Sequence, residues 1–217
     1  RDLVVTGVQT CALPIYDTYT GELKWRFNTI PQEGEEFTNT WENDSWRTAG
    51  NTNVWTFMSA DDDAGIVYLP TSTPTNDYWG GMRLGENLFA EALVALDADT
   101  GELVWHFQHV RNDLLDLDWA FERQIIELPV NGEIRRAVVT GGKAAIFEAM
   151  DAVTGEYLFS IDLDMQNVFS EIDPRTGDKT MFPEAVLKPG EDTPGLAKNG
   201  RSEDGTRLNS SHNQISY

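Results

Sequence analysis

The 217-residue sequence has a single cysteine, three histidines and few basic side chains. No apolar run approaches the roughly 18 residues that a membrane-spanning helix needs. Only 16 lysines and arginines stand against 36 aspartates and glutamates, which gives a formal net charge of −20. Because this charge repels phosphate groups, we expect no nucleic acid and no anionic membrane surface among the partners. The 40% of hydrophobic residues suffices for a core in one or two domains.

Both ends of the chain resemble translated sequencing adapters. Val5 to Ile15 reads VTGVQTCALPI, the translation of one adapter strand. Thr206 to His212 reads TRLNSSH, and RSE begins at Arg201; both correspond to the partner strand. The alternative is a natural terminus that happens to encode the same residues.

We therefore predict three parts in the chain: an adapter-derived segment at 1–15, a genuine domain at 16–200 and a second adapter-derived segment at about 201–217. The only cysteine, Cys11, lies in the first of these segments. The cysteine content consequently says nothing about the redox compartment.

Long stretches of helical periodicity are also lacking. ERQIIELP is too short for a helix and is bounded by Pro129. The sequence has instead short runs rich in β-branched and aromatic residues, which are typical of strands. These runs are LKWRFNT, GIVYLP, ALVALDA, LVWHFQH, RRAVVTG, KAAIFEAMDA and EYLFSIDL.

One turn motif recurs in three copies: DTYTGELKW ending at Trp25, DADTGELVW at Trp105 and DAVTGEYLF at Phe159. In each copy the Asp side chain is suited to cap a turn, and the Gly supplies a positive φ. We expect the terminal aromatic residue to pack between neighbouring sheets. A shorter relative, DPRTGDKT from Asp173, predicts another turn.

Short strands with a recurring turn and aromatic residue predict an all-β fold, a β-propeller or a related closed array. The copies begin at Asp17, Asp97 and Asp151, so four-stranded blades require an insertion in the first interval. The Gly-, Pro- and Asn-rich stretch from Pro70 to Phe89 is the candidate insertion, and such loops are often functional. The alternative is that the motif is only a common turn, but three copies with a fixed aromatic position favour the propeller.

These segments resemble the pyrroloquinoline quinone (PQQ)-dependent dehydrogenases. The resemblance is carried by NVWTFMSADDDAGIVYLPTSTP, GENLFAEALVALDADTGELVWHFQ, NDLLDLDWAF and GGKAAIFEAMDAVTGE, and it extends from Tyr16 to about Pro194. It implies quinoprotein alcohol or glucose dehydrogenases built on a propeller of about eight blades. This chain would then be a partial propeller of two to three four-stranded blades.

The resemblance also implies roles for single residues. Asp116 matches the family's catalytic base, which takes the substrate's hydroxyl proton as hydride leaves for the quinone. Trp55 matches the aromatic floor beneath the PQQ ring, and Lys143 matches the cation that contacts the quinone oxygens. Each residue also has an ordinary alternative: a core tryptophan, a turn aspartate or a solvated lysine.

A metal site follows from the same resemblance. Calcium, or a lanthanide in some branches, would be held by Thr73, Asp116 and Asp118, since hard cations prefer oxygen ligands. The family commonly has Gly-Asn-Pro where this chain has Ser-Thr-Pro, so Thr73 replaces the Asn, with Asn76 nearby. Leu115 replaces the usual Trp before the base. Asp118 has the alternative of a solvated or structural role.

Two further observations bound the site. His106 and His109 look like strand or loop residues, and no His or Cys cluster predicts zinc. The family's metal-binding Glu and vicinal disulfide belong to an upstream part that this sequence does not contain.

Two functions remain open at this stage. The first is a PQQ- and metal-dependent dehydrogenase that oxidises an alcohol or sugar and passes electrons to a cytochrome or quinone. The resemblance implies a periplasmic location, with or without membrane association. The second is a non-enzymatic propeller scaffold of the outer-membrane assembly type. A scaffold has no reason to keep Trp55, Asp116 and Lys143 in register, so the enzyme is favoured. We expect the isolated polypeptide to be inactive.

Overall fold

The computed structural model describes residues 12–77, 79–119 and 121–187. Cys11 and the expected adapter-derived tail at about 201–217 lie outside the described residues. Ala12 to Ile15, the end of the other expected adapter-derived segment, lie in strand β1.

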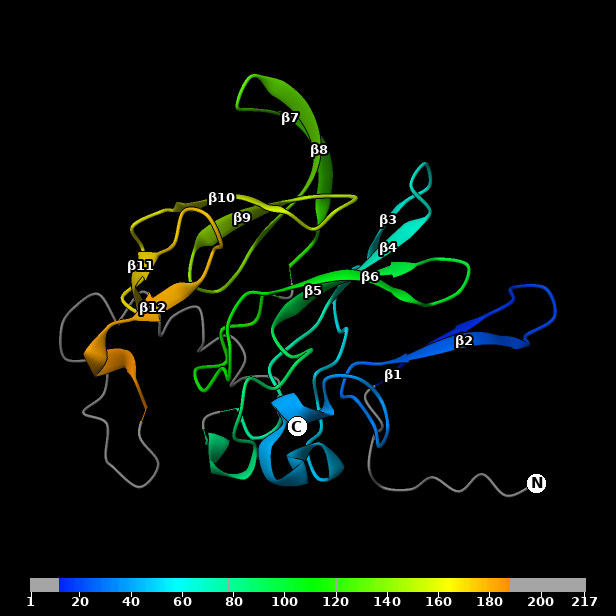
Figure 1. Ribbon diagram of the computed structural model, residues 1–217, viewed down its shortest axis with the longest axis horizontal. Helices are drawn as coiled ribbons and strands as arrows, with labels where there is room; N and C mark the ends of the chain where they lie inside the picture. The colour runs from blue at the N-terminus through cyan, green and yellow to red at the C-terminus, as the bar shows by residue number, and fades with distance from the viewer. Residues whose placement is uncertain (1–11, 78, 120, 188–217) are drawn as a thin grey trace.

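The described residues form antiparallel sheets joined by turns and loops, and they include no α-helix. Two sheets have four strands, and each is flanked along the chain by a two-stranded sheet (Figure 1). The first two-stranded sheet pairs β1 (Ala12–Tyr16) with β2 (Leu23–Asn28), and the second pairs β11 (Phe169–Ile172) with β12 (Lys179–Met181). This all-β arrangement of successive sheets is a partial β-propeller, as the sequence predicts.

The two four-stranded sheets are meanders, in which each strand pairs with the next along the chain. The first contains β3 (Ser59–Asp61), β4 (Ile66–Pro70), β5 (Ala92–Asp97) and β6 (Leu103–Gln108). The second contains β7 (Gln124–Val130), β8 (Glu133–Gly141), β9 (Ile146–Asp151) and β10 (Tyr157–Asp162).

Short 3-10 helices occupy the connections. They are η1 (Thr38–Thr40), η2 (Glu42–Arg47), η3 (Gly80–Met82) and η4 (Pro183–Ala185). None of the helices in the described part of the chain has the length and apolar character needed to cross a membrane.

The predicted turns form as expected from their side chains. Asp97 Oδ1 accepts hydrogen bonds from the main-chain N–H groups of Asp99 and Thr100, at 3.0 and 2.8 Å. Asp151 Oδ1 accepts the equivalent bonds in the next sheet. The glycine of each turn has a φ near +74°, a conformation that favours glycine.

The aromatic residues of the first two copies, Trp25 and Trp105, pack against the turn of the following sheet, as predicted. Trp25 Nε1 donates to Ala98 O at 3.0 Å, and Trp105 Nε1 donates to Ala152 O at 3.1 Å. The third copy differs from the prediction. The side-chain atoms nearest to Gly177 belong to Tyr157 and Phe107, not to Phe159.

The interface between the two four-stranded sheets has an apolar core. Tyr68, Leu93 and Trp105 of the first sheet share a buried cluster with Val138 and Met150 of the second. Burial of such side chains is worth about 1.5–3 kcal/mol each. Packing and the indole hydrogen bonds together fix the order of the sheets.

The structure bears on two segments for which the sequence carries an expectation. The predicted insertion from Pro70 to Phe89 contains no strand between β4 and β5. The segment dismissed as too short for a helix forms strand β7, which includes Pro129. Proline is tolerated there because β7 is an edge strand of its sheet.

Candidate active site

The candidate residues come from loops at one edge of the two four-stranded sheets. Thr73 follows β4, and Asp113 to Asp118 follow β6. Lys143 lies between β8 and β9. In antiparallel meanders these three connections leave the same edge of their sheets, and the contacts below join them.

The loop from Asp113 to Asp118 is held from inside by its first carboxylate. Asp113 is buried; its Oδ1 accepts from Leu115 N and its Oδ2 from Leu117 N, both at 2.8 Å. The two leucines point into a core cluster with Trp119. The acidic and apolar residues of this stretch therefore separate onto two sides, and Asp113 is the carboxylate that organises the loop.

The loop from Asp113 to Asp118 is not an extended strand. Asp116 has a φ of 53° and Asp118 a φ of 35°, both in the left-handed region. Non-glycine residues adopt this region at a cost of about 1–2 kcal/mol each. The two carboxylates converge because of this backbone shape and not because of strand alternation.

Lys143 lies between these two carboxylates. Its Nζ donates to Asp118 Oδ2 at 2.9 Å and to the main-chain oxygen of Asp116 at 2.9 Å, and it lies 3.1 Å from Asp116 Oδ2. Its main-chain N–H donates to Leu117 O at 3.1 Å. The side chain of Lys143 is only 5% exposed, so the ammonium group is held in an oxygen-lined pocket of the loop.

The pKa values of Asp116, Asp118 and Lys143 are not all shifted in the same direction. Burial and the negative charge of Asp118 raise the pKa of Asp116 to about 7, against the opposing effect of Lys143. Burial also acts to raise the pKa of Asp118, but the ammonium of Lys143 outweighs it and lowers that pKa. Burial acts to lower the pKa of Lys143, and the two carboxylates raise it. Asp116 is thus the member whose proton occupancy changes near neutral pH.

Thr73 connects Asp118 to two further buried carboxyl groups, those of Glu91 and Asp113. Its Oγ1 lies 2.6 Å from Glu91 Oε1 and 2.6 Å from Asp113 Oδ2, and its main-chain N–H donates to Asp118 Oδ1 at 3.1 Å. A hydroxyl group has one proton to donate, so one of the two carboxyl contacts needs a protonated carboxyl as donor. Burial raises the pKa of both Glu91 and Asp113, and the main-chain N–H groups of Leu115 and Leu117 oppose this rise at Asp113.

The sequence analysis missed three charged residues near this group. Glu91 is fully buried and also accepts from Trp119 N at 3.0 Å. Arg83 Nη2 donates to Asp113 O at 2.5 Å, and burial lowers its pKa. Burial and the charge of Asp118 raise the pKa of Asp77. A glutamate directly before the apolar run of β5 was the available signal for Glu91.

The structure thus brings together Thr73, Asp116, Asp118 and Lys143, which we call the Lys143 cluster. Trp55 lies outside the contacts that join this cluster in the described residues. It is half exposed and two residues beyond Asn53, whose N–H donates to Ser72 Oγ at 2.9 Å. Its segment therefore adjoins the strand end that carries Thr73.

The donor atoms of the Lys143 cluster are oxygens, which suit hard cations. Within residues 12–77, 79–119 and 121–187, however, no group of three or more His, Cys, Asp or Glu side chains is arranged to hold a metal ion. The hydroxyl of Thr73 is engaged by Glu91 and Asp113, and its main-chain oxygen accepts from Thr52 N. Asp116 and Asp118 are consequently better suited than Thr73 to act as ligands.

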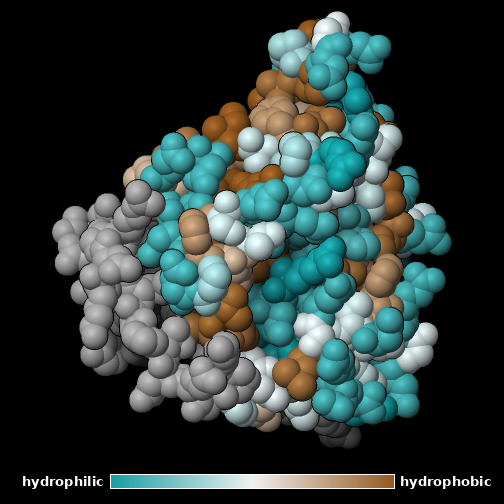
Figure 2. All heavy atoms as spheres, turned by 60° about the vertical axis from the view of Figure 1, so that its left-hand side comes forward, coloured by the Kyte–Doolittle hydropathy of each residue, from teal (hydrophilic) through white to brown (hydrophobic). Residues whose placement is uncertain are grey.

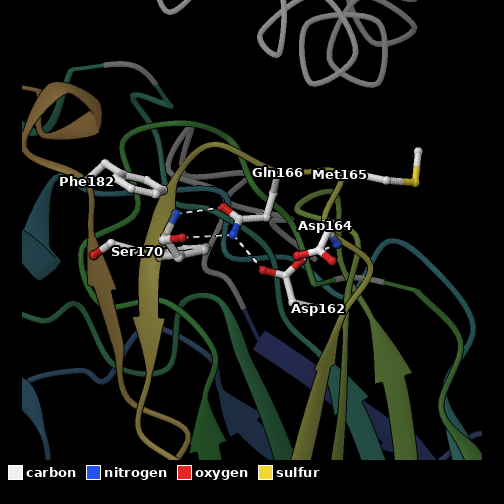
Figure 3. A pocket seen from close by; sticks show the side chains of 7 residues that line it. Asp162, Asp164, Met165, Gln166, Ser170 and Phe182 are labelled. Carbon is white, nitrogen blue, oxygen red and sulfur yellow. Dashed lines mark hydrogen bonds between the residues drawn. The ribbon is translucent and has the colours of Figure 1, made fainter.

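A separate cavity of about 390 Å³ lies at the connection from β10 to β11. Gln166 satisfies its own amide there by bonding to Asp162 and to the main chain of Val168 and Phe169, whereas Met165 points away (Figure 3). No member of the Lys143 cluster lines this cavity. The surface of the molecule mixes both kinds of side chain, with hydrophilic ones gathered over the middle of one face (Figure 2).

Comparison with known protein families gives one match. The family described as "PQQ: Glucose/ethanol/alcohol dehydrogenase, beta-propeller domain" matches residues 6–168. The "Alcohol dehydrogenase (quinone), dehydrogenase subunit" of Acetobacter aceti is 32% identical in an alignment 188 residues long, which covers 79% of this chain and 25% of the relative. "Lupanine 17-hydroxylase [cytochrome c]" of a Pseudomonas species is 32% identical over 76% of this chain and 26% of its own length.

Solved structures agree on the fold. The quinohemoprotein alcohol dehydrogenase ADHIIG from Pseudomonas putida HK5 aligns with a TM-score of 0.74 at 28% identity, over 80% of this chain and 27% of its own. A europium-containing methanol dehydrogenase aligns with a TM-score of 0.78 at 23% identity, over 87% of this chain and 36% of its own, which bears on the fold alone. The chain spans about a quarter of the length of the curated relatives it matches.

Proposed function

Because the chain belongs to the family of PQQ-dependent glucose, ethanol and alcohol dehydrogenase β-propeller domains, we propose that it is a segment of a longer quinoprotein that oxidises an alcohol or a sugar. The observation that carries the proposal is the arrangement of Asp116 and Asp118 around the ammonium group of Lys143. Stability alone does not require a buried ammonium between carboxylates, since apolar residues of similar volume often stabilise a fold equally well.

Asp116 is the proposed catalytic base. When bound, PQQ supplies a carbonyl group that accepts the hydride of the substrate. The carboxylate of Asp116 takes the substrate's hydroxyl proton, and its pKa of about 7 suits proton transfer near neutral pH. Leu115 and Leu117 pack beneath the loop and limit its movement.

The cofactor contacts are assigned to Trp55 and Lys143. The half-exposed indole of Trp55 offers a flat apolar face, which suits a planar ring system. The positive charge of Lys143 suits the charge that develops on quinone oxygens, and a direct contact with them would replace one of its three present contacts with Asp116 and Asp118. These residue types fit the chemistry of PQQ.

A calcium or lanthanide ion is the proposed metal. Asp116 and Asp118 would hold it through carboxylate oxygens, with further ligands from the longer protein. Thr73, the third predicted ligand, is assigned instead to positioning, because its hydroxyl bridges Glu91 and Asp113.

The remaining parts of the proposal concern partners and location. The names of two relatives specify a quinone and cytochrome c, so a quinone or a cytochrome is the proposed electron acceptor. The periplasm, with or without membrane association, is the proposed compartment. The substrate is a small alcohol or sugar, and no nucleic acid takes part.

The test is a dye-linked oxidation assay on the complete protein that contains this segment. We expect turnover of alcohols or aldoses that depends on added PQQ and calcium, and none from the 217-residue chain alone. Absence of both turnover and PQQ binding by the complete protein would contradict the proposal. The same assay distinguishes a non-enzymatic scaffold, which would show no turnover with or without PQQ and calcium.

A further inference from the structure

A second buried group of ionisable side chains lies beside the Lys143 cluster. His109 Nδ1 lies 2.6 Å from Glu148 Oε2, and Lys179 Nζ donates to Glu148 Oε1 at 2.6 Å and to His109 O at 3.0 Å. The three side chains are 0 to 3% exposed. We call them the interblade triad, because His109 follows β6, Glu148 lies in β9 and Lys179 begins β12 (Figure 1).

The triad surrounds one side chain, the indole of Trp119. The imidazole of His109 stacks on the indole with ring centroids 5.3 Å apart and planes 10° apart. Lys179 Nζ lies 5.0 Å from the ring centroid of Trp119, within the range of a cation–π interaction. Trp119 is fully buried, so these contacts define its position.

The indole in turn contacts both backbones that carry the Lys143 cluster. Trp119 directly follows Asp118, and its main-chain N–H donates to Glu91 Oε2 at 3.0 Å. A Cβ on Gly142 would lie only 2.3 Å from Trp119 Cδ2, so the ring lies directly on the residue before Lys143. A shift of the indole therefore moves Asp118 and Lys143 relative to each other.

The charges of the triad are not needed merely to hold the sheets together. Burying an ion network costs desolvation energy, and apolar residues of similar volume often stabilise a protein equally well. A network of directed hydrogen bonds does, however, fix orientation. The distances within the triad supply this fixed orientation next to the Lys143 cluster.

We propose that His109, Glu148 and Lys179 are positioning residues that hold Trp119 against Gly142 and so set the pairing of Asp118 with Lys143. The link to catalysis rests on the proposed function of the Lys143 cluster. The positioning itself is a property of the folded chain.

The test compares Lys179→Met, which removes the charge at similar length, with Lys179→Arg, which keeps a cation and hydrogen-bond donors. Glu156→Gln is the control, because Glu156 pairs with Arg135 in the same sheet as Glu148 but is exposed. All variants are made in the complete protein. Two measurements are taken: amide hydrogen exchange at Trp119 and Lys143, and the steady-state constants kcat and KM.

In Lys179→Met we expect exchange at the Trp119 and Lys143 amides to accelerate about tenfold or more, with the central amides of β5 unchanged. We expect kcat to fall about tenfold to a hundredfold with little change in KM, because misplacement of a catalytic group lowers kcat. Lys179→Arg should restore most of both values, and Glu156→Gln should alter neither. If Lys179→Met fails to fold, the neutral double variant Glu148→Gln/Lys179→Met replaces it.

Unchanged exchange at Trp119 and Lys143, or equal acceleration throughout β5, would overturn the positioning role. Faster local exchange with an unchanged kcat would overturn its link to the reaction. Absence of turnover in the unaltered protein would instead contradict the proposed function, and the exchange measurement would still decide the positioning role.

Discussion

The indole Nε1 of Trp105 donates a hydrogen bond to the main-chain oxygen of Ala152, 3.1 Å away in the turn of the next sheet. The same ring packs on the glycine of that turn, Gly155. The first four-stranded sheet thus contacts the second through both a polar and an apolar interaction of one side chain. Trp25 makes the equivalent contacts with Ala98 and Gly101.

This contact predicts a large effect of Gly155→Ala. Gly155 has a φ of +73°, and an added Cβ would lie 2.6 Å from Trp105 Cδ2. The left-handed backbone costs about 1 kcal/mol for alanine, and the overpacking adds about 1–3 kcal/mol. Urea unfolding followed by tryptophan fluorescence measures the loss.

Gly132→Ala is the matched control for this substitution. Gly132 has a φ of +87°, and nothing lies within 4 Å of an added Cβ. It should therefore show only the backbone cost. Equal losses in the two variants would mean that the contact with Trp105 contributes little.

Thr73→Val should destabilise the protein by about 2–3 kcal/mol, because it leaves buried polar atoms of Glu91 and Asp113 without their shared partner. Thr73→Ser keeps the hydroxyl and should cost less than about 1 kcal/mol. Chemical denaturation of both variants provides the comparison. A loss as large in Thr73→Ser as in Thr73→Val would show that the methyl group, not the hydroxyl, is responsible.

Stability should depend on pH through His109. Burial lowers the pKa of His109 in the folded protein to about 4, with Glu148 opposing and Arg123 and Lys179 reinforcing the shift. The histidine pKa of the unfolded chain is about 6.5. Between pH 6.5 and 4 the unfolded state therefore binds a proton that the folded state does not bind, and this favours unfolding. The contribution is complete above pH 6.5 and is lost as the pH falls toward 4.

The loss is on the order of 3–4 kcal/mol, since each unit of pKa difference corresponds to about 1.4 kcal/mol. His109→Gln keeps a donor for Glu148 but does not titrate, so its unfolding free energy should vary less between pH 6.5 and 4. The difference between the two pH profiles isolates His109 from the carboxylates. Parallel profiles would contradict the assignment.

Asp116→Asn should lower kcat of the complete protein by about 10²–10⁴-fold, because an amide does not accept the substrate proton. Asp99→Asn, an exposed turn residue, is the control and should leave kcat unchanged. The measurement is dye-linked oxidation with PQQ and calcium present. Retention of more than about a tenth of the activity in Asp116→Asn would assign the base to another residue.

The sequence predicts local structure well where a few adjacent residues suffice. The Asp-x-x-Thr-Gly turns form because the capping carboxylate and the glycine lie within one turn. Strand β7 was missed because its only strong local signal, Pro129, argues against a strand unless the strand lies at an edge. Edge position is a property of the assembled sheet.

The same distinction applies to the candidate site. The residue types and spacing of the sequence single out Asp116, Asp118 and Lys143 as residues of the candidate site. For Thr73 they predict only metal binding, whereas in the folded chain its hydroxyl contacts Glu91 and Asp113. They do not reveal Glu91, which becomes part of the site only because strand β5 begins beside the loop that carries Asp113.

The sequence by itself determined the repeated turns, the aromatic residue that each turn's strand presents, and the residue types of the candidate site. These depend on interactions between residues a few positions apart. Only the tertiary structure decided which carboxyl groups have shifted pKa values, which ring rests on each turn, and how the side chains of the interblade triad surround Trp119. Those outcomes depend on burial, and burial is defined only when distant parts of the chain have packed together.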